Sequence, residues 1–490
     1  MRYWERRLAS KFLWLVSAAY AFWAWRLIEK SSLVAVDGKQ YFCLFDDAMI
    51  AMRYAWNLAH GKGCCWNVGQ YVQGYTSPLM VGVMALPCAV FSKSTACHAV
   101  QLLGIPTVLA VAWYTRRIFL LLTARRGLSL GVFVAVLAYY PLSYWSLMGM
   151  EVGLVVLLML VALGYALRHA VARCAVFLCL AFLARPDFVV LAAVLLVFLF
   201  LTHRQRALLA AGAFAAFVAL VLACQYLYYG DALPNTYTLK AVGVPAGDRI
   251  RDGLGFVRPF FVWTLPLLGL AAVGLWPSHR RRRLLLAALA GAVLAYQISV
   301  GGDPWPLWRM LVPMIPLALL LAASGARFLL RGSSLAATVA VGLALVLCDL
   351  PFAAEILLKA KPYKSDETIL NVNTALVLNQ TLPPGSSIGV EWAGALPYYT
   401  DFRAIDFLGK TDRNIARMKP DTTGKVAFSG MRSVPGHNKY NLDYSIVELQ
   451  PDYIQRCDWG HSNVCPWASE HYTVIWVEGI DLAIRNELLP

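Results

Sequence analysis

Two adjacent carboxylates, Asp46 and Asp47, open a helical pattern near the start of the chain. A single acidic side chain is enough to cap a helix, because it accepts hydrogen bonds from the free N–H groups at the helix start. A pair of neighbouring carboxylates suits a different task, either general-base work on a hydroxyl group or binding of a divalent cation. The sequence therefore predicts a catalytic or cation-binding role for this pair.

Other charged side chains recur in the loops between apolar segments. Taken singly, each is better explained as a solvated loop charge or a helix cap than as a functional group. Together they are harder to dismiss, because ionisable groups near membrane depth are costly unless they pair or line a wet cavity. They would offer carboxylates, aromatic rings that stack on a sugar, and cations that bind a phosphate. The candidate site residues besides the aspartate pair are Arg53, Glu151, Arg185, Asp187, Asp231, Tyr237, Lys240, Asp303 and Arg309.

The composition predicts that these residues are positioned by a polytopic α-helical membrane protein. Hydrophobic residues make up 59% of the 490 residues and charged residues 14%, against about 45–50% and about 25% in soluble proteins. A membrane-spanning helix needs about 20 apolar residues, and the apolar runs give about eleven spans. The predicted spans are 12–28, 97–115, 128–147, 153–167, 174–184, 188–202, 207–228, 256–276, 284–300, 310–324 and 335–352.

The formal net charge of +15 is concentrated in alternate loops. The clusters at 2–11, 116–126, 168–173, 204–206, 280–283 and 327–331 hold 18 basic side chains and one acid, Glu5. The positive-inside rule places such loops in the cytoplasm, which removes the case for a nucleic-acid partner. We therefore predict a multi-pass protein of the bacterial inner membrane, with a cytoplasmic N-terminus and a periplasmic C-terminus. The candidate site residues then share the outer face.

The first outer loop is predicted to span residues 29–96. Within it, Met49, Met52 and Trp56 form an apolar stripe from which Arg53 and Asn57 lie apart, which is typical of an amphipathic helix lying flat on the membrane. If the apolar stretch 78–91 crossed the membrane, the sides of all later loops would be reversed, and the basic loop that begins at Arg116 would lie on the outer face. It is therefore predicted to be an interfacial or re-entrant helix.

The chain divides into a transmembrane module, 1–352, and a small periplasmic α/β domain, 353–490. The tail shows a helical pattern at 366–380 and β-like runs at 387–390 and 472–476. Its Cys457 and Cys465 form one group of outer cysteines, and Cys43, Cys64 and Cys65 form another. Each group holds either one disulfide or free thiols in an oxidising periplasm. The cysteines and histidines show no metal-ligand spacing.

Several runs of this sequence resemble the GT-C membrane glycosyltransferases, most closely the AftB-like arabinofuranosyltransferases. The likeness begins in the first loop and continues, in order, over nearly the whole chain. It includes Asp46-Asp47, Arg53-Tyr54-Ala55, Asn57-Leu58, Trp66-Asn67, Gly74-Tyr75-Thr76-Ser77-Pro78-Leu79, Gly149-Met150-Glu151, Arg185-Pro186, Gly230-Asp231, Leu233-Pro234-Asn235-Thr236, Gly301-Gly302-Asp303, Gly394-Ala395-Leu396-Pro397-Tyr398-Tyr399 and Ile405-Asp406-Phe407-Leu408-Gly409.

The resemblance implies transfer of a sugar, D-arabinofuranose, from a polyprenyl-phosphate carrier to an acceptor hydroxyl on a cell-surface glycan or on a protein such as pilin. It places the general base in the first loop. We predict Asp46 as that base, with Asp47 holding it or a divalent cation. Arg53, Lys240 and Arg309 are predicted to contact the phosphate, and Glu151, Asp187 and Asp303 to shape the sugar pocket.

The alternative is a flippase or transporter of lipid-linked sugars, which also places charges at helix ends. The sequence shows no repeated half and no charge in the middle of a span, which argues against a transporter. The two functions differ in geometry. A transferase would gather the acids around one outward cavity, whereas a transporter would string them along a transmembrane path.

Overall fold

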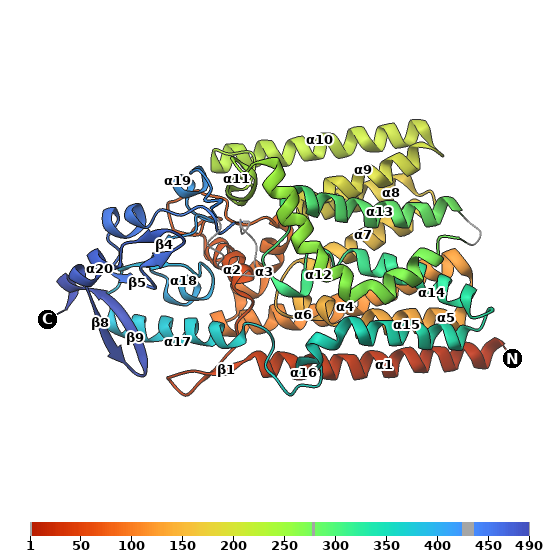
Figure 1. Cartoon of the computed structure of the whole chain (residues 1–490), viewed down its shortest axis with the longest axis horizontal. Helices are drawn as coiled ribbons and strands as arrows, with labels where there is room; N and C mark the ends of the chain where they lie inside the picture. Colours follow the sequence, from red (N-terminus) through yellow and green to blue (C-terminus); the bar gives the residue numbers. More distant parts are fainter. Residues whose placement is uncertain (1, 277–279, 424–435, 490) are drawn as a thin grey trace.

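The computed structural model describes residues 2–276, 280–423 and 436–489. Figure 1 shows a bundle of long helices that ends against a smaller C-terminal domain, with the N-terminus at the far end of the bundle. The helices of the bundle are α1 (Arg2–Ser31), α4 (Lys93–Thr123), α5 (Arg126–Ala138), α6 (Tyr140–Leu147), α7 (Val152–Leu167), α8 (Val171–Ala184), α9 (Val189–Phe200), α10 (Arg204–Tyr229), α12 (Ala246–Val273), α13 (Arg280–Val300), α14 (Met314–Leu329) and α15 (Ser334–Asp349).

Five of the described helices are long and apolar enough to cross a membrane. The bent pair α5 and α6 would make a sixth, with an angle of 53° between its halves. Four of the predicted spans coincide instead with apolar helices of 10–17 residues, Val152–Leu167, Val171–Ala184, Pro186–Phe200 and Met314–Leu329. The five long helices are Lys93–Thr123, Arg204–Tyr229, Ala246–Val273, Arg281–Val300 and Ser334–Ile356.

The basic clusters lie at the end of the bundle away from the C-terminal domain. Tyr229, the last residue of α10, donates a hydrogen bond to the Cys64 carbonyl in the first loop, over 2.8 Å. Arg204 begins the same 26-residue helix, so it lies about 39 Å away at 1.5 Å per residue. The chain's N-terminus lies at that distant end too (Figure 1).

Glycines allow α12 to pack closely against two neighbouring helices. A Cβ on Gly253 would come within 2.3 Å of the Ile298 carbonyl oxygen on α13. A Cβ on Gly325 of α14 would come within 2.0 Å of the Leu270 oxygen of α12. Only a residue without a side chain permits such contacts. These contacts fix the helices that lead into and out of the loops carrying Lys240 and Arg309.

The first loop contains β1 (Leu33–Val34), β2 (Gln40–Tyr41), α2 (Asp46–Ala59) and α3 (Pro78–Val90). The helix predicted at 78–91 is confirmed as α3. Helix α2 packs against α3 and against α18 (Ala395–Thr400) of the C-terminal domain, and its Arg53 and Asn57 are buried. The expectation that these two side chains face solvent from a helix lying on the membrane is therefore wrong. Asn57 donates to the Cys65 and Trp66 carbonyl oxygens within the first loop, and Arg53 bridges this loop and the tail of the chain.

The C-terminal domain is built on a five-stranded mixed sheet of order β4-β3-β5-β9-β8. Strand β3 pairs in parallel with β4 and β5, while β9 pairs antiparallel with β5 and β8. The helical pattern and both β-like runs predicted in the tail are found here. The elements are α16 (Ala353–Ile356), α17 (Ser365–Thr381), β3 (Ser387–Val390), α18, β4 (Arg403–Asp406), α19 (Arg413–Ala416), β5 (Tyr453–Ile454), β6 (Asp458–Trp459), β7 (Ser462–Asn463), α20 (Cys465–His471), β8 (Tyr472–Val477) and β9 (Ile480–Arg485).

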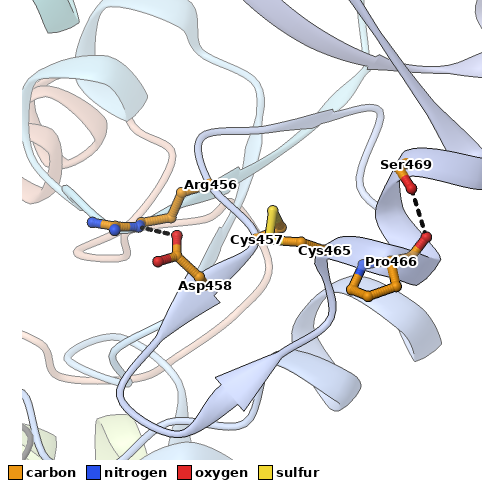
Figure 2. The surroundings of a disulfide bond; sticks show 6 residues. All are labelled: Arg456, Cys457, Asp458, Cys465, Pro466 and Ser469. Atoms are coloured by element: carbon orange, nitrogen blue, oxygen red, sulfur yellow. Dashed lines mark hydrogen bonds and ion pairs between the residues drawn. A yellow bond between two sulfur atoms is a disulfide. The ribbon is translucent and has the colours of Figure 1, made fainter.

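One of the two predicted cysteine groups forms a disulfide. Cys457 and Cys465 are bonded across the β6–β7 hairpin, as Figure 2 shows. In the first loop, Cys43, Cys64 and Cys65 are free thiols. The disulfide therefore closes a short loop of the C-terminal domain.

The short helix α11 (Asn235–Ala241) joins the bundle to the C-terminal domain. The buried Lys439 ammonium donates hydrogen bonds to the carbonyl oxygens of Thr238, Val242 and Ala416, over 2.8, 2.9 and 2.8 Å. The first two acceptors belong to α11 and the residue after it, and the third lies at the end of α19. A single side chain thus ties α11 to the domain.

Candidate active site

A cavity of about 240 Å³ lies where the bundle, the first loop and the C-terminal domain meet. Its lining includes both carboxylates and cations, from segments far apart in the chain. Seven of the eleven predicted site residues line it: Asp47, Glu151, Arg185, Asp187, Tyr237, Lys240 and Arg309. Three of the six predicted acids, Asp47, Glu151 and Asp187, therefore share one cavity with four cations.

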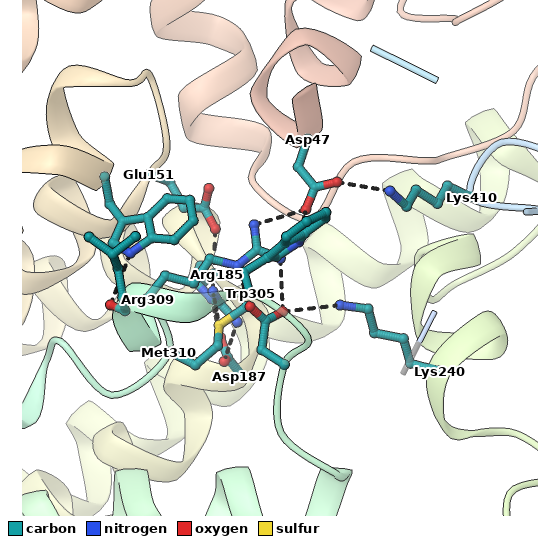
Figure 3. Close-up of polar contacts among 12 residues, drawn as sticks. Asp47, Glu151, Arg185, Asp187, Lys240, Trp305, Arg309, Met310 and Lys410 are labelled. Carbon is teal, nitrogen blue, oxygen red and sulfur yellow. Dashed lines mark hydrogen bonds and ion pairs between the residues drawn. The ribbon is translucent and has the colours of Figure 1, made fainter. Parts of the chain in front are cut away.

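Asp47 lies between two cations from opposite sides of the cavity. Its Oδ1 accepts from Lys410 Nζ at 2.9 Å, and its Oδ2 lies 2.8 Å from a terminal nitrogen of Arg309. Trp305 Nε1 also donates to Oδ2, over 3.3 Å (Figure 3). Burial alone would raise the pKa of Asp47, but Lys410 and Arg309 hold that pKa well below its usual value.

Arg309 is oriented by a second carboxylate beneath it. Asp303 accepts two hydrogen bonds from the guanidinium, each 2.8 Å long, and is only 1% exposed. This forked contact fixes the plane of the guanidinium. Lys240 Nζ lies 4.0 Å from the same carboxylate. Asp303 therefore positions two cations and is itself not among the described residues that line the cavity.

A second charged group lines another part of the cavity. Arg185 makes a forked contact with Asp187, with distances of 2.9 and 2.7 Å, and lies 3.3 Å from Glu151. Because these side chains are partly buried and paired, they present hydrogen-bonding atoms in fixed directions. Such an array suits recognition of the hydroxyl groups of a sugar.

Asp46 differs from Asp47 in its surroundings. Consecutive residues on a helix point about 100° apart, and Asp46 faces the C-terminal domain, where its Oδ1 accepts from the Ala395 N–H over 3.0 Å. Its Oδ2 has no hydrogen-bond partner among the described residues. Burial raises the pKa of Asp46 to about 6, against the opposing effect of Lys410. Asp46 is not among the described residues lining the cavity.

Two further predicted residues are used elsewhere. Arg53 donates to the carbonyl oxygens of Trp66 and Phe402, over 2.6 and 2.7 Å, and to that of Pro397. It therefore joins the first loop to the C-terminal domain rather than facing the cavity. Asp231 pairs with Arg413 and Arg417, at 2.8 and 3.0 Å, and is itself not among the described residues that line the cavity.

Sequence reasoning missed Lys410, the cation that the C-terminal domain brings into the cavity. A signal was present, since Lys410 follows directly on Ile405-Asp406-Phe407-Leu408-Gly409, a run that resembles the glycosyltransferases. It also missed Thr236, which lines the cavity and whose buried hydroxyl has no hydrogen-bond partner among the described residues. That hydroxyl is available to a bound ligand.

The arrangement around the aspartate pair does not fit a divalent cation. The Asp47 oxygens face an ammonium, a guanidinium and an indole N–H, and a metal ion would be repelled by the two positive groups. Within the described ranges, no group of three or more His, Cys, Asp or Glu side chains could hold a metal ion.

Comparison with known proteins bears on the fold. The profile of a domain of unknown function, DUF8728, matches residues 361–482. A comparison with curated proteins finds no match.

Solved structures similar to this chain include ArnT from Cupriavidus metallidurans in two states. The apo form has a TM-score of 0.58 at 13% identity, over 99% of both chains. The form bound to undecaprenyl phosphate has a TM-score of 0.55 at 14% identity, over 80% of this chain and 85% of ArnT. The expected GT-C fold, a polytopic helical membrane protein with a small C-terminal sheet domain, is thereby confirmed.

Proposed function

We propose that this chain is a glycosyltransferase that moves a sugar from a polyprenyl-phosphate donor to an acceptor hydroxyl. The observation that carries the proposal is the single cavity at the end of the bundle, lined by three carboxylates and four cations. The similarity to ArnT, one form of which is bound to undecaprenyl phosphate, supports a lipid-linked donor.

The reaction needs few groups, because a lipid phosphate is already a good leaving group. The acceptor oxygen attacks the anomeric carbon while the bond from that carbon to the phosphate oxygen breaks. The acceptor proton passes to a carboxylate, and the polyprenyl phosphate leaves as a phosphate monoester stabilised by cations. Orientation of the two substrates and stabilisation of the leaving phosphate then supply most of the rate enhancement.

Asp47 is our candidate for the general base, in place of Asp46. A base must lie within hydrogen-bond reach of the proton that it abstracts, and Asp47 lines the cavity whereas Asp46 does not among the described residues. Asp46 instead holds the start of α18 through the Ala395 N–H. Its contribution to transfer is then the position of the C-terminal domain.

The Glu151, Arg185 and Asp187 group is the candidate sugar site, with Tyr237 as an aromatic wall. We take D-arabinofuranose as the donor sugar, on the resemblance to the AftB-like enzymes. The acceptor is a surface glycan or a surface protein such as pilin. The orientation follows from the basic end of the bundle, which belongs in the cytoplasm, so that the cavity opens toward the periplasm of the inner membrane.

The direct test is to incubate the purified protein with synthetic polyprenyl-phosphoryl arabinofuranose and candidate acceptors, and to detect the product by mass spectrometry. We expect Asp47→Asn to lower transfer by at least about 100-fold. Asp46→Asn is the matched control, with a much smaller loss expected. A large loss in Asp46→Asn together with an active Asp47→Asn would return the base to Asp46. Absence of transfer to every acceptor, with efflux of the intact donor from vesicles, would instead favour the flippase.

A further inference from the structure

Lys410 reaches the cavity from the C-terminal domain, and its ammonium contacts a carboxylate of the first loop, Asp47, over 2.9 Å. The lysine is buried. Burial lowers its pKa, but Asp47 and Asp46 raise it by more, so the net shift is upward. Lys410 is therefore a charged ammonium inside the cavity.

Two side chains hold the loop that carries Lys410. The Asp406 carboxylate accepts from the backbone N–H groups of Leu408 and Thr411, over 3.0 and 2.7 Å. From the other side, the Asn235 amide nitrogen donates to the carbonyl oxygens of Gly409, Lys410 and Asp412, over 2.9, 3.2 and 3.0 Å. Asn235 is buried, and all three of these contacts of its amide nitrogen are with this loop.

Asn235 lies on α11, the same short helix that carries Lys240. Lys240 Nζ approaches Asp303, which also orients Arg309. The amide of Asn235 therefore sets Lys410 relative to Lys240, and Asp303 sets Lys240 relative to Arg309. Arg309 and Lys410 contact the Asp47 carboxylate directly. Lys240 approaches the Asp303 carboxylate beneath, on the same side of the cavity as Lys410 in Figure 3, and its charge also acts on Asp47.

We propose that Lys410, Arg309 and Lys240 together form the binding site for the donor phosphate, and that the Asp47 carboxylate occupies this site until the phosphate arrives. The inference rests on the proposed function. It assigns a task to the domain that matches residues 361–482, which supplies one of the three cations. Asn235 is a positioning residue that acts through Lys410.

Replacement of the Asp47 carboxylate by the donor phosphate, an exchange of anions, also links donor binding to proton abstraction from the acceptor. Asp47 shares Lys410 and Arg309 with an incoming phosphate, so each anion weakens the other's attraction to the two cations. Once the phosphate has taken over these contacts, the Asp47 carboxylate is released toward the acceptor hydroxyl. The base thus becomes available only in the loaded site.

The test is direct binding of polyprenyl phosphate to the full-length protein in detergent, measured by titration without any acceptor. We expect Lys410→Met to weaken binding at least tenfold and Lys410→Arg to restore most of it. Lys419→Met, an exposed lysine nearby in the sequence, is the matched control and should bind as the wild type does. Unchanged binding in Lys410→Met would overturn the assignment while leaving the proposed function intact. Wild-type protein that binds no polyprenyl phosphate would overturn both.

A second variant tests whether Asp47 competes with the phosphate for the same cations, as distinct from a general loss of folding. Asp47→Asn removes the competing carboxylate, so we expect polyprenyl phosphate to bind at least threefold more tightly even though transfer is lost. Equal or weaker binding in Asp47→Asn would refute the exchange of anions.

Asn235→Asp places a carboxylate against three carbonyl oxygens and so releases the Lys410 loop. We expect it to raise the KM for the donor at least fivefold with less change in kcat. A fall in kcat alone would overturn its positioning role.

Discussion

The buried carboxylate of Asp46 makes the stability of this protein depend on pH in a defined direction. Its pKa rises from 3.8 to about 6 on folding, chiefly because the side chain is buried. The folded state therefore binds this proton more tightly than the unfolded state does. Above about pH 6 the folded protein carries an unfavourable buried charge, and this penalty shrinks as the pH falls toward 3.8.

The size of the penalty follows from the shift. The rise of the Asp46 pKa from 3.8 to about 6 destabilises the folded state by about 3 kcal/mol at pH 8, where the group is charged in both states. At pH 4.5 the Asp46 carboxyl is almost fully protonated in the folded state, and the destabilisation falls to about 1 kcal/mol. Asp46→Asn removes the titration and keeps an oxygen for the Ala395 N–H. The variant should therefore gain about 2 kcal/mol more, relative to wild type, at pH 8 than at pH 4.5.

The assay is thermal unfolding of the wild type and the variant in detergent at both pH values. The readout is the change with pH of the difference in Tm, which cancels any constant effect of the asparagine amide. Asp366→Asn is a matched control, because Asp366 also lies in the first turn of a helix but its side chain is 82% exposed. A difference in Tm that is the same at both pH values would refute the reasoning.

Three further predictions concern the packing, the tail and the topology. Gly394→Ala should lower the yield of folded protein, because the new Cβ would lie 2.1 Å from the Asp46 carbonyl oxygen. Gly342→Ala is the control, since its Cβ would enter open space, and size-exclusion profiles would compare the folded yields of the two variants. Cys457→Ser removes a disulfide between cysteines eight residues apart in sequence. The C-terminal domain should lose about 2–3 kcal/mol of stability, measured as a fall in Tm. A periplasm-dependent reporter fused after the last residue should be active, and cytoplasmic activity there would reverse the orientation.

The sequence predicted those parts of the site whose partners lie near them in the chain or at the same end of neighbouring helices. Arg185 and Asp187 are two residues apart, and Asp303 and Arg309 are six apart. Their loops connect successive helices of the bundle, so the alternation of the spans was enough to bring these loops to one end. The convergence of seven predicted residues on one cavity follows from that regularity.

The errors arise where partners are distant in sequence. Arg53 stands off the apolar stripe of its helix, which locally indicates a solvent-facing side chain. Its partners Pro397 and Phe402 lie 344 and 349 residues away, so helical periodicity could not reveal them. Lys410 was missed for the same reason, since its partner Asp47 is 363 residues distant. Asp46 and Asp47 are adjacent in sequence, but consecutive helical residues point about 100° apart. Their different surroundings could therefore not be predicted from their adjacency.

The cavity is assembled from residues that leave the ribosome at very different times. Asp47 is among the first fifty residues to be made, whereas Lys410 arrives when more than four-fifths of the chain has been synthesised. A partly made chain, with every bundle helix already inserted, still has no ammonium opposite Asp47. Synthesis therefore sets an order: every helix of the bundle is made before the lysine that completes the lining of the cavity. Premature termination before residue 410 would leave the bundle helices without the ammonium that pairs with Asp47.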